Sequence, residues 1–238
     1  MKTAAEVRVS PDAETLAREA ARYFIEIARD AAKQRGRFAV ALSGGSTPKS
    51  LYSLLASAEF RDQVPWAQTH WFWGDERCVP PDDPQSNYRM VKEALLSKAP
   101  VPPSNVHRMA GEDAEPERAA RRYEQELRTF FGGLPCLDLV LLGLGEEGHT
   151  ASLFPGSPAL EEQERWVVAP YVEKLKSHRL TLTLPVINAA ANVAFLVAGA
   201  GKREILKQVT SSEGDLPAQQ VRPKRGKLVW MADEAAVL

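Results

Sequence analysis

Three short apolar runs, each followed at once by a turn that contains glycine, constrain the fold of this chain more than any other feature. They cover residues 38–42, 137–142 and 193–198. Apolar runs of this length that end at glycine are typical of buried strands. Strands buried on both faces occur mainly in parallel sheets. Because helical patterns lie between the runs, the sequence predicts an α/β fold with a mainly parallel sheet.

Helix signals alternate with strand signals along the whole chain. Ser10 is a capping residue, Pro11 fits the first helical position, and an amphipathic pattern continues to Arg35 and stops at Gly36. We expect further strands at residues 6–9, 69–73, 106–109, 166–169, 180–184 and 228–230, and further helices at 48–55, 88–98, 114–131, 203–209 and 233–238. No linker interrupts this order, so we expect one domain over residues 1–238.

Charge and composition argue against several classes of function. The net charge is −1 and the pI is about 6.5, so nothing indicates binding to nucleic acid or to an anionic membrane. No apolar run reaches the ~20 residues of a membrane span, and residues 1–6 lack the apolar core of a signal peptide. Cys78 and Cys136 have no metal-ligand spacing. We expect a cytoplasmic protein with reduced thiols, either a monomer or a weak dimer.

The loop Ser43-Gly44-Gly45-Ser46-Thr47 follows the first buried strand and precedes a helix. Free N–H groups at a helix start, the helix dipole and the added hydroxyls favour an anion such as phosphate. The loop lacks the lysine of a P-loop, and Pro48 breaks the pattern of a nucleophile elbow. The alternative is an ordinary tight turn in which Thr47 caps the helix.

His149 is the strongest candidate for a catalytic base. It lies in a glycine-rich, acidic loop directly after the apolar run at 137–142. Open α/β sheets place their chemistry just beyond the carboxyl ends of their strands, and a neutral imidazole can accept a proton near neutral pH. The alternative is a structural histidine that caps a turn.

The same loop contains a false lead. Residues 143–148 match the G-x-G-x-x-G pattern of dinucleotide-binding loops. Glu146 and Glu147 would repel a pyrophosphate, while Pro155 and Pro158 limit any helix that follows. We therefore reject a dinucleotide site.

Charged residues follow two other predicted strands. Asp75 and Arg77 come just after the aromatic strand at 69–73. Arginine at a strand end can bind a phosphate, and an acid can orient a reacting group, although a solvated turn with an internal salt bridge is the alternative. Lys202 stands at a helix N-terminus, where a lysine opposes the dipole unless an anion is held there.

Together, three segments closely resemble the 6-phosphogluconolactonase family. They are Leu42–Pro48, Trp73–Arg77 with Ser86-Asn87-Tyr88, and Gly143–Pro155. The resemblance covers nearly the whole chain. It implies a three-layer α/β/α fold related to glucosamine-6-phosphate deaminase, with no metal and no organic cofactor. It also implies a carboxylic ester hydrolase that converts 6-phospho-D-glucono-1,5-lactone in the oxidative pentose phosphate pathway.

The resemblance also assigns roles to residues of this chain. His149 corresponds to the catalytic base, and Asp75 to a site acid. The family usually has aspartate where this chain has Glu147, whose carboxylate would orient His149 or the substrate. The phosphate-binding residues implied are Ser43, Gly44, Gly45, Ser46, Thr47, Arg77, Arg179 and Lys202.

The chemistry of a lactone suits this set of residues. A lactone is an ester, so its hydrolysis needs a water deprotonated near the carbonyl and a proton returned to the ring oxygen; one histidine can do both in turn. Two rivals are a phosphosugar isomerase or deaminase on the same fold and a phosphosugar-binding module without turnover. The deaminases follow the histidine with an Asn-Glu-Pro segment, whereas this chain has Ser152–Pro155.

Overall fold

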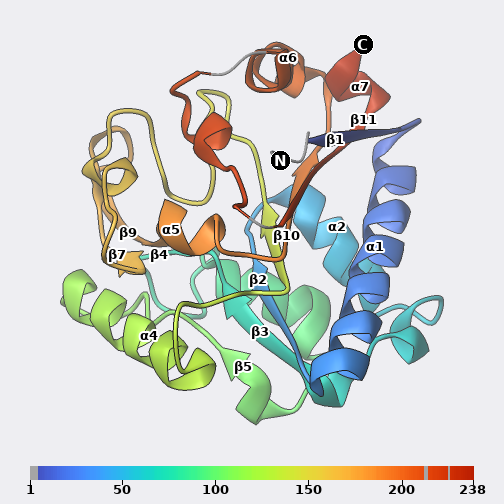
Figure 1. The fold of residues 1–238 in the computed structure, drawn as a ribbon, viewed down its shortest axis with the longest axis horizontal. Helices are drawn as coiled ribbons and strands as arrows, with labels where there is room; N and C mark the ends of the chain where they lie inside the picture. Colours follow the sequence, from blue (N-terminus) through green and yellow to red (C-terminus); the bar gives the residue numbers. More distant parts are fainter. Residues whose placement is uncertain (1–4, 212–213, 225) are drawn as a thin grey trace.

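The computed structural model describes residues 5–211, 214–224 and 226–238 (Figure 1). Within them, a central sheet has the strand order β1-β11-β10-β6-β2-β3-β5. Every neighbouring pair in this sheet is parallel, which confirms the predicted class. The strands of the sheet are β1 (Glu6–Ser10), β2 (Phe38–Leu42), β3 (Thr69–Trp73), β5 (Val106–His107), β6 (Leu139–Leu142), β10 (Asn192–Val197) and β11 (Lys227–Asp233).

Helices pack on both faces of the sheet, as the two faces of β3 show. Phe24 of α1 stacks on Trp71, with ring centroids 5.8 Å apart. Phe72 points to the opposite face, because side chains alternate along a strand, and its ring lies 5.1 Å from that of Phe130 in α4. The three-layer arrangement is therefore confirmed (Figure 1). The helices are α1 (Ala13–Arg35), α2 (Ser46–Leu55), α3 (Asn87–Val91), α4 (Pro116–Phe131), α5 (Leu184–Ile187), α6 (Arg203–Ser211) and α7 (Glu234–Val237).

Short helical turns connect several of these elements. A π-helical turn, Lys92–Leu96, directly extends α3, so the two together cover most of the helix predicted at 88–98. Single 3₁₀ turns cover Arg61–Gln63, Trp66–Gln68, Pro103–Asn105, Pro158–Leu160, Glu173–Leu175, Ala200–Lys202 and Pro217–Gln220. None of the helices in the described part of the chain is long and apolar enough to span a bilayer.

A small antiparallel sheet stands beside the central one. It consists of β4 (Asp75–Arg77), β9 (Ser177–Leu182) and β7 (Val167–Val168), and β8 (Tyr171–Val172) also pairs with β9. The alternative of a solvated turn at residues 74–77 is thus wrong. The three polar residues form a strand because β9 supplies backbone partners, from Asp75 opposite Thr181 to Arg77 opposite Arg179.

Two predicted helix caps are also wrong. The N-cap of α1 is Asp12 rather than Ser10, because the Asp12 carboxylate accepts the N–H of Thr15 at 2.7 Å. Helix α2 begins at Ser46 with Gly45 as its N-cap and without a capping side chain, so Thr47 lies inside the helix. The predicted stop at Gly36 is confirmed, since Gly36 adopts the left-handed conformation with φ of 73°.

Candidate active site

A cavity of about 300 Å³ opens where four chain segments leave the strands. It is lined by residues 43–48 after β2, by Asp75 and Arg77 of β4, by residues 143–145 and 149–151 after β6, and by residues 196–198 and Lys202 around the end of β10. Asn87 completes the lining. Because β2, β6 and β10 are parallel neighbours, their carboxyl ends lie at one edge of the sheet, which brings these distant segments together.

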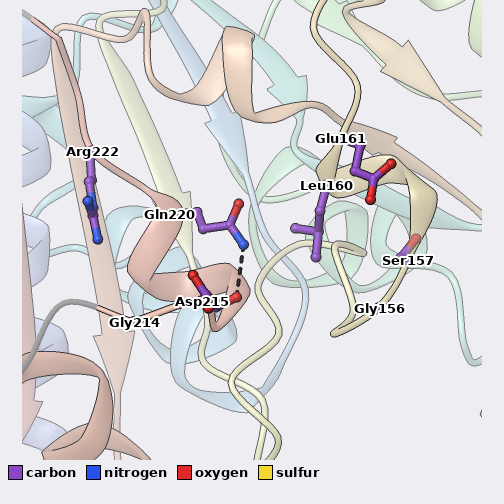
Figure 2. A pocket seen from close by; sticks show the side chains of 8 residues that line it. All are labelled: Gly156, Ser157, Leu160, Glu161, Gly214, Asp215, Gln220 and Arg222. Carbon is purple, nitrogen blue, oxygen red and sulfur yellow. Dashed lines mark hydrogen bonds between the residues drawn. The ribbon is translucent and has the colours of Figure 1, made fainter.

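A second hollow is larger but lacks this chemistry. It measures about 490 Å³ and is lined by residues of the 156–161 and 214–222 segments (Figure 2). The side-chain amide of Gln220 donates to the carbonyl of Asp215 at 2.8 Å inside it. Its lining contains no residue that the sequence predicted for the site. The candidate active site is therefore the cavity at the strand ends.

The loop Ser43–Thr47 forms one wall of the cavity. Gly45 has φ of 105°, which glycine adopts without strain, and α2 starts directly after it. Gly44 packs against Asn87 so closely that a Cβ on it would lie 2.0 Å from the Asn87 Oδ1 atom. The Ser43 Oγ atom is buried and has no hydrogen-bond partner among the described residues. An unpartnered hydroxyl in a cavity wall is free to bind a ligand.

Arg77 and Arg179 face each other across the antiparallel pair β4 and β9. Arg77 lines the cavity and donates to the carbonyl of Gln85 at 2.5 Å. Arg179 is buried and donates to Ser177 Oγ and to the carbonyl of His178, each at 3.1 Å. Burial and the neighbouring charge of Arg77 lower the pKa of Arg179. Arg77 lines the cavity, so its charge is available to an anion there, whereas Arg179 lies beside it and outside the lining.

Lys202 lines the same cavity from the end of β10, which lies on the opposite side of β6 from β2. It ends the 3₁₀ turn Ala200–Lys202 and immediately precedes α6. The turn is held by Asp233, whose two carboxylate oxygens accept the N–H of Gly199 at 2.9 and 3.1 Å. The predicted position of Lys202 at a helix start is confirmed, and its side chain lines the cavity with Arg77.

The loop after β6 holds His149 against glycine. The carbonyl of His149 accepts the N–H of Gly145 at 2.8 Å. A Cβ on Gly145 would lie 2.0 Å from His149 Nδ1, so the imidazole occupies space that only glycine leaves open. The ring also stacks on Phe154, with centroids 4.2 Å apart. These contacts fix the imidazole at the cavity wall.

Glu147 lies behind His149 rather than in the cavity lining. Its Oε2 atom is 3.1 Å from His149 Nδ1. The two atoms are at ion-pair distance, although Nδ1 has no hydrogen bond of ordinary geometry in the described structure. The other oxygen, Oε1, accepts a hydrogen bond from Lys174 Nζ at 2.9 Å. Burial opposes ionisation of Glu147, but Lys174, its own backbone N–H and His149 outweigh burial and lower its pKa to about 2.

Asp75 is buried, and both of its carboxylate oxygens accept hydrogen bonds. Its Oδ2 accepts the hydroxyl of Ser152 at 2.7 Å, and its Oδ1 accepts the amide of Asn87 at 3.3 Å. The neighbouring Glu76 accepts the backbone N–H groups of Arg77, Asn87 and Tyr88, each at 2.7 Å. The Glu76 carboxylate thus fastens the start of α3, and with it Asn87, to β4.

Most of the predicted site residues meet in this cavity. Its lining includes Ser43, Gly44, Gly45, Ser46, Thr47, Asp75, Arg77, His149 and Lys202. Glu147 and Arg179 do not line the cavity. Glu147 contacts His149, and Arg179 lies beside Arg77. The sequence did not single out Lys174, whose partner Glu147 lies 27 residues away, or Tyr52, whose hydroxyl bonds the backbone of Ser43. Ser152 and Asn87 were noted only as parts of motifs, and Asn87 also as a helix cap. In the described chain, no three His, Cys, Asp or Glu side chains are grouped to hold a metal ion.

Comparison with known proteins decides the family. The sequence pattern of the family described as glucosamine-6-phosphate isomerases/6-phosphogluconolactonase matches residues 11–230. The chain belongs to this family. A 6-phosphogluconolactonase from Nostoc sp. is 43% identical to this family member over 237 residues, which cover 97% of the chain and 96% of the relative. One from Synechocystis sp. is 46% identical over 210 residues, with 85% of each protein covered. The resemblance inferred from three motifs is therefore confirmed.

Solved structures of the family have the same fold. The structure described as devB protein has a TM-score of 0.88 and 36% identity, with 97% of each chain covered. The 6-phosphogluconolactonase from Trypanosoma cruzi has a TM-score of 0.87 and 29% identity, covering 99% of this chain and 97% of that chain. A monomeric glucosamine-6-phosphate deaminase, at 19% identity and a TM-score of 0.84, shares the fold alone.

Proposed function

We propose that this family member hydrolyses 6-phospho-D-glucono-1,5-lactone to 6-phosphogluconate, as in the oxidative pentose phosphate pathway. The observation that carries the proposal is that His149, Arg77, Lys202 and the loop Ser43–Thr47 line one cavity. A base and a phosphate-binding wall in a single cavity match a substrate that has a reactive ester and a phosphate. The names of relatives that align over nearly their whole length support the same activity.

His149 acts as the general base in this proposal. Its Nδ1 atom faces Glu147. The other ring nitrogen, Nε2, therefore accepts the proton from water. The resulting hydroxide attacks the lactone carbonyl carbon and forms a tetrahedral intermediate. The bond between that carbon and the ring oxygen then breaks, and the imidazolium returns its proton to the ring oxygen, which becomes the hydroxyl group of the open acid. The Glu147 carboxylate stabilises the imidazolium between the two transfers.

The positive charges of Arg77, Arg179 and Lys202 fix the position of the substrate. Arg77 and Lys202 bind phosphate oxygens, Arg179 adds positive charge behind Arg77, and the hydroxyls and N–H groups of Ser43–Thr47 complete the cradle. Binding the remote phosphate holds the lactone carbonyl near His149, so that attack becomes effectively unimolecular. Asp75, which is held by Ser152 and Asn87, keeps the cavity wall between the loop and β4 in place. A cytoplasmic location and a monomeric or weakly dimeric state belong to the same proposal.

The deciding experiment follows acid release after freshly prepared lactone is added to the protein. We expect release well above the spontaneous rate, and we expect no ammonia from glucosamine 6-phosphate. Ammonia release instead would assign the chain to deaminase chemistry. Tight binding of 6-phosphogluconate without acceleration of lactone opening would make the protein a binding module. Gel filtration of the same sample checks the oligomeric state.

A further inference from the structure

The hydroxyl of Tyr52 satisfies both backbone groups of Ser43, the first residue of the loop Ser43–Thr47. It accepts the N–H of Ser43 at 3.0 Å and donates to the carbonyl of Ser43 at 2.9 Å. Tyr52 belongs to α2 and is fully buried. One side chain therefore supplies both hydrogen bonds at the point where the chain leaves β2.

This arrangement leaves the Ser43 side chain available. The residue is 4% exposed, it lines the cavity, and its Oγ atom has no partner in the described part of the chain. Buried hydroxyls usually have a hydrogen-bond partner, and for this Oγ atom the partner has to come from the cavity. The Tyr52 hydroxyl holds the Ser43 backbone in one orientation, and that orientation keeps Oγ in the cavity wall.

We propose that Tyr52 is a positioning residue for substrate binding, which acts through Ser43 and never touches the ligand. By fixing the Ser43 backbone, Tyr52 directs Ser43 Oγ and the following N–H groups of Gly44 and Gly45 towards the phosphate. The identity of this ligand rests on the proposed function. Asn87 supports the loop from the other side, where it packs against Gly44.

The chain contains a matched control for this role. Tyr123 of α4 accepts the N–H of Trp73 at 2.8 Å and donates to its carbonyl at 3.3 Å. Like Tyr52, it is buried and pins the end of a parallel strand, here β3. Trp73 does not line the cavity. Tyr123→Phe therefore removes the same two hydrogen bonds at a neighbouring strand end, from a residue outside both the loop Ser43–Thr47 and the cavity lining.

The test compares Tyr52→Phe with Tyr123→Phe. The Kd for 6-phosphogluconate is measured by calorimetry, kcat and KM by acid release, and the melting temperature of each variant is recorded. We expect Tyr52→Phe to raise the Kd and KM about tenfold, the effect of one misplaced hydrogen bond to a charged group, with kcat changed less than about threefold. Tyr123→Phe should lower the melting temperature comparably and leave both Kd and KM at wild-type values. Equal effects of the two variants on Kd, or no effect of Tyr52→Phe, would overturn the proposal.

A double-mutant cycle shows whether Tyr52 acts through Ser43. If it does, the double variant Tyr52→Phe/Ser43→Ala raises the Kd for 6-phosphogluconate by a smaller factor than the two single factors multiplied together. A factor equal to that product would contradict this route. Because Kd is measured without turnover, failure of the lactone assay would remove the proposed function but not this test. If Tyr52→Phe does not fold, amide hydrogen exchange of the wild-type protein tests the proposal instead. We expect the Ser43 amide to exchange slowly, and fast exchange would show that Tyr52 does not hold the loop.

Discussion

The carboxylate of Glu147 lies 3.1 Å from Nδ1 of His149 and remains ionised because its pKa is lowered to about 2. Burial by itself would favour the neutral acid, so the lowering depends on the positive partner Lys174 and on the backbone N–H of Glu147. An ionised Glu147 favours the tautomer of His149 that carries its hydrogen on Nδ1. That tautomer presents an unprotonated Nε2, the form a general base needs.

We predict that Lys174→Gln lowers kcat by about two- to fivefold and leaves KM unchanged. The Lys174 side chain is 72% exposed, and exposed ion pairs contribute only ~1 kcal/mol or less. Without the Lys174 ammonium, the Glu147 carboxylate spends part of its time away from the His149 imidazole. Lys207→Gln, at an exposed position on α6, is the control and should behave as wild type. An unchanged kcat in Lys174→Gln would show that Glu147 needs no anchor.

We predict that His149→Asn lowers kcat by about 10²–10⁴-fold, the usual effect of losing a general base. Asparagine has a similar size and still forms hydrogen bonds, but it accepts no proton from water. Binding of 6-phosphogluconate should change little, because the phosphate cradle remains. The assay subtracts spontaneous lactone hydrolysis. His178→Asn, at a half-buried histidine whose Nδ1 lies 2.9 Å from the carbonyl of Ala169, controls for the loss of an imidazole. A folded His149→Asn variant with near wild-type turnover would move the role of base to Asp75 or Glu147.

Sequence predictions were accurate for elements set by their own composition and failed for elements whose partners lie far away in the sequence. Strand β2 matches residues 38–42 and β3 matches residues 69–73, because their apolar composition alone demands burial. Strand β4 could not be predicted, since Asp, Glu and Arg are poor strand formers and their partners lie about a hundred residues away on β9. The 3₁₀ turn that carries Lys174 was equally invisible.

Inside the site, a partner nine residues away in sequence was also missed. Motifs indicated His149, Arg77 and the loop Ser43–Thr47, because each lies within a few residues of the end of a predicted strand. The contact that aims Ser43 was hidden, since Tyr52 looks like any other apolar position on the buried side of α2. The roles assigned to the individual site residues, and the single domain over residues 1–238, stay predictions.

We predict that Arg77→Gln and Lys202→Gln each weaken 6-phosphogluconate binding by roughly 1.5–3 kcal/mol, the contribution of a charge-assisted hydrogen bond. The two residues come from β4 and from the turn before α6, yet they line one cavity, so the losses should depend on salt concentration in the same way. Arg89→Gln, which removes an exposed partner of Glu93, is the control. Wild-type affinity in either cavity variant would remove that residue from the cradle.

We predict that His70, near the start of β3, makes the fold less stable in acid. His70 Nδ1 lies 3.1 Å from His107 Nε2, and His107 Nδ1 lies 2.6 Å from Glu126. Burial, the neighbouring His107 and the charge of Arg37 lower the pKa of His70 from 6.5 to about 4. The fold therefore favours neutral His70, whereas the unfolded chain takes up the proton near 6.5. As the pH falls from about 6.5 to about 4, only the unfolded chain gains this proton, so the free energy of unfolding must fall across that window.

We expect this loss to be about 1–2 kcal/mol, less than the full shift implies because the imidazole is only half-buried. Urea unfolding of the wild type and of His70→Gln at pH 7.0, 5.5 and 4.5 measures it, with pH values chosen to fall inside and above the window. The variant should be less stable than wild type at the highest pH, because it disrupts the contact with His107, and the gap should narrow on acidification. His178→Gln controls for histidine loss elsewhere. A gap that stays constant between the highest and lowest pH would mean that His70 keeps its ordinary titration in the folded protein.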